Sequence, residues 1–500
     1  MRDRQPTTAV DLLWKAADAM RGAMDAANYK STVLTLLYLR FLSLEFEKSQ
    51  PQLCTEDMAA LDAACAVDAP RWLPRPARWN ILTQRIRDHG DDPVTTLGEA
   101  FDALTRSDRD LADVLPPATA LVGGMERHQV IRLFSLFDEL QEGLDDLYEG
   151  LLVEFARFEG RKGGEFHTPT SVARLLVEAL QPQQGRIYDP CCGTGGLLVQ
   201  TTRYVAEMGG EPAAHLACYG QEVNMESWQL AWMNLNIHGC DPTGLGRADT
   251  LDRDRWPELK ADVVLANPPF NMATWAYPKR ESRWRYGIPP RTNANFAWLQ
   301  HVVDKLSDRG SAGVVLANSS MSSKRMGESE IRAAMVEDDL VACVVALPAQ
   351  LFRSTMMSAC VWFLTKDKSP QPGTGLTDRR GQTLFVDARS MGEMAGRAHR
   401  VLTNGELARI AGAYQSWRGT HRTGEEYRDV PGFCRSAGID EVREKRHILT
   451  PARYVIATEA DRSQLCEHPR DRTDALTRDL LELLDESDRL AEEMRRHLDA

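Results

Sequence analysis

Residues 262–270 carry the side chains best suited to bind a planar amino group. Four apolar residues at 263–266 predict a short buried strand, which ends at Asn267-Pro268-Pro269-Phe270. The two prolines fix two φ angles and remove two N–H donors, so the turn is stiff. A stiff turn can hold an amide side chain, a carbonyl and an aromatic ring, which offer an amine two acceptors and a stacking surface. The alternative is an ordinary strand-ending turn, because short motifs also match by chance.

A second segment, residues 187–199, predicts a ligand-binding loop. It reads Ile-Tyr-Asp-Pro-Cys-Cys-Gly-Thr-Gly-Gly-Leu-Leu-Val, the order strand, glycine turn, helix start of a nucleotide-binding first βα unit. The glycines permit positive φ and close approach of a ligand to the backbone. No Gly-Lys-Ser/Thr follows, which argues against a phosphate loop and ATP hydrolysis. A ligand with a carboxylate and no phosphate suits this helix N-terminus, and S-adenosylmethionine fits that description.

An acidic residue follows the next predicted strand. Residues 215–219 form that strand, and Gly220-Gln221-Glu222 comes directly after it. An acid at the end of the second strand of such a fold can accept hydrogen bonds from ribose hydroxyls. The position of Glu222 in the βα pattern favours this role over that of an exposed loop acid.

These motifs, in this order, resemble the amino-group DNA methyltransferases that use S-adenosylmethionine. Three further segments narrow the resemblance: residues 164–169 (Gly-Glu-Phe-His-Thr-Pro), residues 232–239 (Trp-Met-Asn-Leu-Asn-Ile-His-Gly) and residues 285–301, which include Asn-Ala-Asn-Phe-Ala-Trp. Together they look like the modification subunit of a type I restriction–modification system. The similarity is densest over 149–387 and weaker in the terminal helices. Cys191-Cys192 departs from the pattern, since many relatives carry Ala or a single Cys there.

The resemblance implies site-specific DNA adenine N6-methylation with S-adenosylmethionine, within a multi-subunit complex. Its expected partners are double-stranded DNA and a specificity subunit, because no target-recognition domain is evident in the sequence. A restriction nuclease or translocase subunit is a further candidate partner. The alternatives are a protein glutamine N5-methyltransferase, a methyltransferase of a related phage-defence system, and a non-catalytic scaffold. The intact Asn267 and glycine loop argue against the scaffold.

Residue roles carried over from the family place the chemistry on the Asn-Pro-Pro-Phe turn. The Asn267 side chain and the Pro268 carbonyl would accept the two amine hydrogens, Pro269 would stiffen the turn, and Phe270 would stack on an adenine flipped out of the duplex. The expected cofactor contacts are Glu165, Phe166, His167, Thr168, Pro169, Thr170, Asp189, Gly193, Thr194, Gly195, Gly196, Glu222 and Asp249.

Three of these cofactor assignments carry a more specific interpretation. Asp189 could hold the methionine amino end, and Asp249 could hold the cofactor adenine or simply cap a helix. His167 is interpreted as a packing residue rather than a general base. No metal-binding constellation is visible.

Bulk properties fit a large intracellular enzyme. The 500 residues suggest about two or three domains. The hydrophobic fraction is 43%, and no apolar run reaches membrane-spanning length. The amino terminus lacks the apolar stretch of a signal peptide. Ten cysteines without paired zinc spacing predict reduced, mostly buried thiols in a cytoplasmic protein.

The net charge of −12 argues against a domain that binds DNA on its own. Basic and aromatic residues nevertheless alternate after the Asn-Pro-Pro-Phe turn, an arrangement that suits phosphates and an extruded base. The alternative is a solvated basic loop with packing aromatics. The candidate DNA contacts are Lys279, Arg280, Arg283, Arg285, Tyr286 and Arg291.

The elements that must position these residues indicate an α/β fold. Strands predicted at 313–317, 341–347, 359–364 and 384–387 alternate with helical stretches, which favours a doubly wound, Rossmann-like methyltransferase sheet. Beyond Asp387 the pattern weakens. We predict an amino-terminal all-helical domain at 1–152, the methyltransferase domain at 153–390, a carboxy-terminal extension at 391–470 and an amphipathic helix at 471–500. The leucine stripe of that helix would pack on its own chain or on a partner.

Overall fold

The computed structural model describes residues 26–49, 72–159, 168–277, 282–325, 327–352, 358–371, 375–395 and 399–455. Several predictions concern residues outside these ranges: the cofactor contacts Glu165, Phe166 and His167, the DNA contacts Lys279 and Arg280, and the helix at 471–500.

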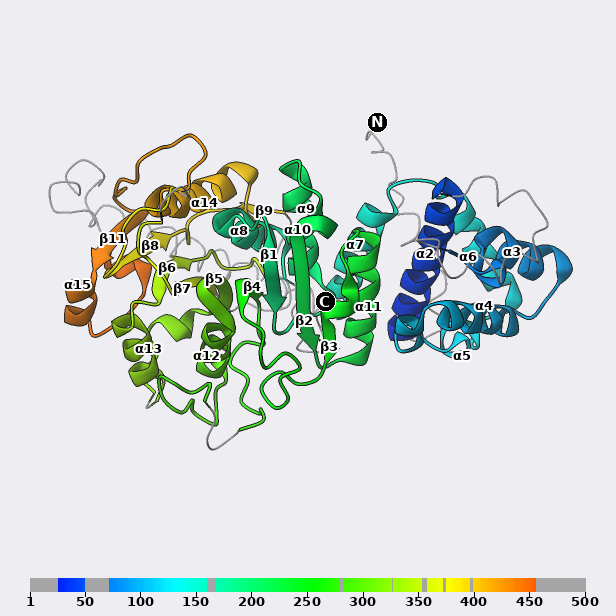
Figure 1. The fold of residues 1–500 in the computed structure, drawn as a ribbon, viewed down its shortest axis with the longest axis horizontal. Coiled ribbons are helices and arrows are strands. Elements are labelled where there is room, and N and C mark those ends of the chain that lie inside the picture. Colours follow the sequence, from blue (N-terminus) through cyan, green and yellow to red (C-terminus); the bar gives the residue numbers. More distant parts are fainter. Residues whose placement is uncertain are drawn as a thin grey trace, which may run out of the picture.

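The amino-terminal part is helical, as the sequence predicts. Helix α2 (Ala26–Ser49) carries the apolar row, with Leu34 and Leu37 fully buried. Helix α4 (Pro93–Ser107) begins where the Asp92 side chain accepts the N–H of Thr95 at 2.9 Å, with proline at its first position. The other helices of this part are α3 (Trp79–Thr83), α5 (Ala118–Val122), α6 (Arg127–Asp138) and α7 (Leu144–Glu159) (Figure 1).

A nine-stranded sheet forms the centre of the rest of the described chain, in the order β11-β8-β6-β7-β5-β4-β1-β2-β3. Its strands are β1 (Gly185–Asp189), β2 (Leu216–Glu222), β3 (Leu245–Arg247), β4 (Ala261–Ala266), β5 (Leu306–Ala317), β6 (Val341–Ala346), β7 (Ala359–Thr365), β8 (Gln382–Asp387) and β11 (Cys434–Gly438). The pairs from β3 to β5 are parallel, as a doubly wound fold requires. Strand β7 runs antiparallel to both β5 and β6, a direction that the sequence pattern did not indicate.

Helices cover both faces of the sheet (Figure 1). One face holds α8 (Thr170–Leu180), α9 (Gly196–Glu207), α11 (Met225–Ile237) and α14 (Asn404–Arg418), and the other holds α12 (Asn295–Lys305) and α13 (Glu328–Glu337). The side chains of strand β4 pack alternately into the buried clusters on the two faces of the sheet. Val263 and Leu265 enter one buried cluster, whereas Val264 and Ala266 enter the other, because successive strand residues point to opposite faces.

The sheet continues beyond residue 390, where the sequence pattern weakens. Strand β11 pairs antiparallel with β8 in the register Cys434 to Val386, and α14 packs against α8. The stretch 391–455 thus contributes to the same layered body, so the sheet itself does not end at the domain boundary proposed from the sequence. Further short elements are α10 (Pro212–His215), β9 (Glu393–Met394), β10 (Arg400–Val401) and α15 (Ile439–Glu444), and single helical turns lie at Arg75–Ala77, Gln84–His89, Arg109–Ala112, Pro242–Gly244, Asn318–Met321 and Pro451–Arg453.

Helix α11 lies between the sheet and the amino-terminal helices (Figure 1). Trp232 meets the ring of Tyr38 on α2 edge-on at 6.3 Å, and the hydroxyl of Tyr148 on α7 donates to the Leu230 carbonyl at 3.4 Å. Lys30 on α2 pairs with Glu226 at 3.0 Å. One continuous buried cluster therefore runs from the amino-terminal helices into the layer against the sheet.

Two physical properties of the described residues bear on the sequence predictions. None of their helices combines the length and apolar character needed to cross a bilayer. The cysteines among them are free thiols, with Cys192 buried and Cys191 half-buried.

Candidate active site

The main cleft lies at the carboxyl ends of β1 and β4, which are adjacent and parallel. After β1 the chain crosses through α9 to β2 on one side, and after β4 it crosses through α12 to β5 on the other. The two loops therefore diverge and leave a crevice, as expected at a switch point of an open α/β sheet. The cleft contains about 830 Å³ of empty space, which includes the part that is open to solvent. Its wall is formed by Pro190, Cys191, Gly193, Gln221, Glu222, Val223, Ser227, Ala248, Asp249, Thr250, Asn267, Pro268, Pro269, Met272 and Trp298.

Asn267 presents an unused acceptor in this wall. It follows directly after β4, and its Nδ2 donates to the Thr168 Oγ1 at 3.0 Å. Its Oδ1 is buried and has no hydrogen-bond partner among the residues that the structure describes. A buried oxygen without a partner is costly in a folded protein, so this atom is a candidate to bind a ligand donor.

The segment at 293–295 fixes the turn that carries Asn267. Asn271 adopts a positive φ of 53°, a conformation that Asn tolerates better than most residues. Asn295 holds it from both sides: its Oδ1 accepts the Asn271 N–H at 3.0 Å, and its Nδ2 donates to the Asn271 Oδ1 at 3.0 Å. The Ala294 N–H donates to the Met272 carbonyl at 3.0 Å. The sequence singled out this segment only by resemblance, and the structure supplies its physical role.

Phe270 is not part of the cleft wall. Its side chain is only 8% exposed and meets the Phe352 ring at 5.5 Å and 70°. The structure thus brings Asn267, Pro268 and Pro269 to the cleft but leaves the Phe270 ring packed beside it. Stacking on a base stays a prediction that requires this ring face to become accessible.

The glycine loop forms the opposite side of the cleft. Gly193 has a φ of 55°, and a Cβ there would have no atom within 4 Å, so its backbone faces open space. Gly195 has a φ of 82°, and a Cβ there would lie 2.7 Å from the Leu235 side chain on α11. One glycine therefore opens the backbone to a ligand, and the other permits close packing of the loop on α11.

Glu222 joins the glycine loop to the end of β2. One carboxylate oxygen accepts the Gly193 N–H at 2.9 Å, and the other accepts the Asn224 N–H at 2.8 Å. The same side chain belongs to the cleft wall. Glu222 thus lies in the cleft wall and holds the loop in position, and its contact with a ribose stays a prediction.

Two further acids predicted to bind the cofactor lie close to this loop. Asp189 is 1% exposed and accepts the Cys191 N–H at 3.0 Å. Burial, with a smaller effect of the Glu222 charge, raises the pKa of Asp189 to about 7. Asp249 lies in the cleft wall, and its Oδ1 accepts the Leu251 N–H at 3.0 Å across a turn rather than at a helix start.

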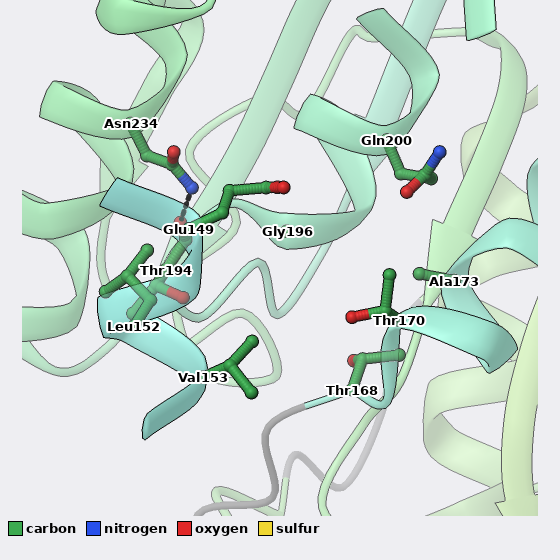
Figure 2. A pocket seen from close by; sticks show the side chains of 10 residues that line it. All are labelled: Glu149, Leu152, Val153, Thr168, Thr170, Ala173, Thr194, Gly196, Gln200 and Asn234. Carbon is green, nitrogen blue, oxygen red and sulfur yellow. Dashed lines mark hydrogen bonds between the residues drawn. The ribbon is translucent and has the colours of Figure 1, made fainter. Parts of the chain in front are cut away.

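A smaller hollow lies on the other side of the glycine loop (Figure 2). Thr168 and Thr170 line it on one side, and Leu152 and Val153 of α7 line it on the other. It contains about 390 Å³ of empty space, counted out to solvent. The full lining set is Glu149, Leu152, Val153, Thr168, Thr170, Ala173, Thr194, Gly196, Gln200 and Asn234. Four predicted cofactor contacts, Thr168, Thr170, Thr194 and Gly196, therefore gather here rather than in the main cleft.

Asn234 is a residue of this hollow that the sequence analysis did not single out. It is 1% exposed, and its Nδ2 donates to the Thr194 carbonyl at 2.9 Å (dashed line in Figure 2). Its Oδ1 is buried and unpaired within the described part of the chain. The sequence could have identified Asn234 as a site residue, because it lies in the 232–239 segment that carried the family resemblance.

The basic loop after the Asn-Pro-Pro-Phe turn is only partly directed outward. Arg283 is half-buried and donates to the Thr250 and Leu251 carbonyls at 3.1 and 3.0 Å. It also lies 3.1 Å from the ring of His301, whose pKa burial and this guanidinium lower to about 3. Arg283 thus anchors the loop to the cleft wall, and its contact with DNA stays a prediction.

The remaining described candidates of this loop are exposed or half-exposed. Arg285 pairs with Asp338 at 3.3 Å, and the Tyr286 hydroxyl donates to the same carboxylate at 2.5 Å. Arg291 is exposed and lies over the Tyr277 ring at 4.9 Å. These three side chains remain available for contacts outside the chain.

Comparison with known protein families gives two consecutive matches. A family model described as N-6 DNA Methylase matches residues 140–463, and one described as HsdM N-terminal domain matches residues 10–140. The junction of the two models falls just before α7 (Leu144–Glu159).

Individual relatives agree with these matches. The chain is 36% identical over 419 residues to the type I restriction enzyme HindI methylase subunit of Haemophilus influenzae, which covers 78% of this chain and 91% of that protein. It is 30% identical to the MjaIX methylase subunit of Methanocaldococcus jannaschii, covering 98% and 90%. Among solved structures, the type I restriction-modification methyltransferase subunit of Streptococcus thermophilus matches with a TM-score of 0.73 at 25% identity, over 89% of this chain and 99% of that chain.

Proposed function

The chain belongs to the N-6 DNA methylase family, among the type I restriction enzyme methylase subunits, and we propose that it methylates the adenine N6 of DNA at the cleft built around Asn267. It is a methyltransferase of a multi-subunit restriction–modification system. The observation that supports the assignment of Asn267 is its buried Oδ1, which has no hydrogen-bond partner within the described ranges and lies at the end of β4 in the same cleft as the glycine loop.

We propose S-adenosylmethionine as the cofactor, which would supply an electrophilic methyl group. The residues fit such a group. Gly193 turns its backbone toward open space, and Glu222, in the cleft wall, would accept bonds from ribose hydroxyls. Asp189, buried beside the loop, would bind the ammonium end, and Asp249, in the cleft wall, would contact the adenine ring.

The protein's own contribution to the reaction is to orient a weak nucleophile. The lone pair of an adenine amine is delocalised into the ring. We propose that Asn267 Oδ1 and the Pro268 carbonyl accept the two amine hydrogens, which favours a tetrahedral nitrogen with its lone pair directed into the cleft. The acceptors are fixed before the base arrives, so catalysis comes from positioning and electrostatics. The proton that the amine loses on methylation passes to solvent.

The base must leave the duplex to reach this turn. We propose that Phe270 stacks on it, after the ring moves away from Phe352, and that Arg285 and Arg291 contact phosphates. Phosphate contacts position the nucleic acid but carry little sequence information. A separate specificity subunit would therefore select the target, and a restriction subunit would join the complex where cleavage occurs. Because the substrate is DNA, we place the protein in the cytoplasm.

Methyl transfer from labelled S-adenosylmethionine tests the proposal against its alternatives. The full chain, assembled with its specificity subunit, is incubated with duplex DNA and separately with protein substrates. We expect label on adenine N6 of DNA. Label on glutamine side chains would instead favour a protein N5-methyltransferase, and no transfer to either would favour a scaffold.

A further inference from the structure

Thr168 lies between the two spaces of the site, and its hydroxyl contacts the side chain that we assign to the acceptor amine. It lines the hollow beside the glycine loop (Figure 2), and its Oγ1 accepts the Asn267 Nδ2 at 3.0 Å. We propose that Thr168 is a positioning residue that sets the orientation of the Asn267 amide for methyl transfer. This inference rests on the proposed role of Asn267 as an acceptor of the amine.

The two ends of the Asn267 amide differ in their hydrogen-bonding chemistry. The amide has a donor end and an acceptor end of nearly the same shape, so sterics alone do not choose between its two orientations. A hydroxyl can accept from the NH₂ end or donate to the oxygen end of an amide. In the structure Thr168 Oγ1 accepts from Nδ2, and Oδ1 then points the other way and lies buried without a partner among the described residues. In the opposite orientation the NH₂ group would face the donors of an adenine amine, and neither the hydrogen bond nor the lone-pair alignment would form.

The backbone around Thr168 makes its hydroxyl a fixed reference point. The next residue, Pro169, is the N-cap of α8 and has a φ of −56°. Its carbonyl accepts the N–H groups of Val172 and Ala173 at 2.8 and 3.0 Å. A proline also restricts the backbone of the residue before it. The start of α8, whose buried face packs on the sheet, therefore holds Thr168 in place. Asn267 lies 99 positions later in the chain, at the end of β4.

The same residue was expected, by resemblance, to contact the cofactor. The two roles predict different kinetics. A cofactor contact would change the cofactor Kd, whereas a residue that acts through Asn267 would change the rate of the chemical step at saturating cofactor and leave the cofactor Kd unchanged.

The test compares Thr168→Val, which removes the hydroxyl with little change of shape, with Thr168→Ser, which keeps it. Thr105→Val is the matched control, because the Thr105 hydroxyl bonds only to carbonyls of its own helix, at 3.0 and 3.3 Å. The full chain assembled with its specificity subunit is used. Single-turnover methylation of duplex DNA gives the rate, and calorimetry with S-adenosylhomocysteine gives the affinity.

We expect Thr168→Val to lower the rate about tenfold, the size of one neutral hydrogen bond, with an unchanged affinity for S-adenosylhomocysteine. Thr168→Ser should recover most of the rate, and Thr105→Val should change neither quantity. In an Asn267→Ala background, Thr168→Val should cause no further loss, because its only route of action is gone.

Three outcomes would overturn the inference: an unchanged rate in Thr168→Val, a weakened affinity at an unchanged rate, or a full additional loss in the double variant. Failure of the wild-type complex to label adenine N6 would refute the proposed function instead, so the two failures are distinguishable. If Thr168→Val does not fold, failure of Thr168→Ser to keep the wild-type rate would itself count against the hydroxyl.

Discussion

Replacing Asn267 with alanine should change the rate of methyl transfer and the free energy of unfolding in different ways. The variant loses one of two fixed acceptors for the amine. The loss of one such preorganised group costs about 2.7–4 kcal/mol in the transition state, which is a rate reduction of roughly 10²–10³. Binding of the cofactor should be nearly unchanged, because the cofactor rests on the glycine loop and not on the Asn267 side chain.

The effect of the same change on the free energy of unfolding should be small or stabilising. The variant loses the Nδ2–Thr168 bond, which contributes about 0.5–1.5 kcal/mol, but it also removes a buried oxygen that has no partner in the part of the chain that the structure describes, a state that costs about 1–3 kcal/mol. The difference ranges from about 0.5 kcal/mol destabilising to about 2.5 kcal/mol stabilising. A catalytic acceptor is expected to accelerate the reaction while lowering the stability of the folded protein without substrate.

Three measurements test this reasoning. Labelled methyl transfer to DNA gives the rate, calorimetry with S-adenosylhomocysteine gives the cofactor affinity, and urea unfolding gives the free energy of unfolding. Asn80→Ala, at an exposed asparagine of α3, serves as the control. A wild-type rate in Asn267→Ala would refute the mechanism. A decrease of more than about 2 kcal/mol in the free energy of unfolding would show that the buried Oδ1 does not destabilise the folded protein.

Further changes should have the following results. Glu222→Gln should weaken S-adenosylhomocysteine binding by about 1.5–3 kcal/mol, because it replaces a charged acceptor for the ribose hydroxyls with a neutral amide; calorimetry showing unchanged affinity would argue against a ribose contact. Cofactor affinity should fall as the pH drops below about 7, since Asp189, with its pKa raised to about 7, becomes protonated and cannot pair with an ammonium group; titrations from pH 6 to 8 should show this slope in the wild type and not in Asp189→Asn. Phe270→Ala should impair methylation of duplex DNA more than methylation of a mismatched adenine, and equal losses on both substrates would argue against stacking. The single chain should bind DNA weakly and without sequence preference, which a gel-shift comparison with and without the specificity subunit would check.

The arrangement of the main cleft followed from the sequence because its parts occur at equivalent places. Gly193, Glu222 and Asn267 lie at or shortly after the ends of β1, β2 and β4, and the carboxyl ends of neighbouring parallel strands meet at one edge of a sheet. Glycine and proline then mark the turns with little ambiguity. The positions of most strands were predictable for the same reason, whereas β3 and β11 were not predicted.

Other features depend on contacts between distant residues, which a sequence pattern does not encode. A charge count cannot tell whether an arginine faces solvent or donates to backbone carbonyls, and Arg283 does the latter. Apolar runs predicted β7 but not its reversed direction, because buried strands are apolar on both faces in either orientation. The burial of Phe270 against Phe352 depends on a residue 82 positions later in the chain. The contact of Thr168 with Asn267 is equally non-local.

The position of α11 has a consequence for how such a protein can be divided or recombined. Its residues Leu230, Trp232 and Leu235 are all at most 5% exposed, and the amino-terminal helices supply part of their cover. A truncated chain that starts at residue 168 would uncover this apolar surface and should self-associate on expression. For the same reason, a chimaera of two relatives joined between the helical part and the sheet would pair mismatched surfaces on α11. We therefore expect viable hybrids to inherit α2, α7 and α11 from one parent, even though α11 lies more than sixty residues past the junction of the two family models.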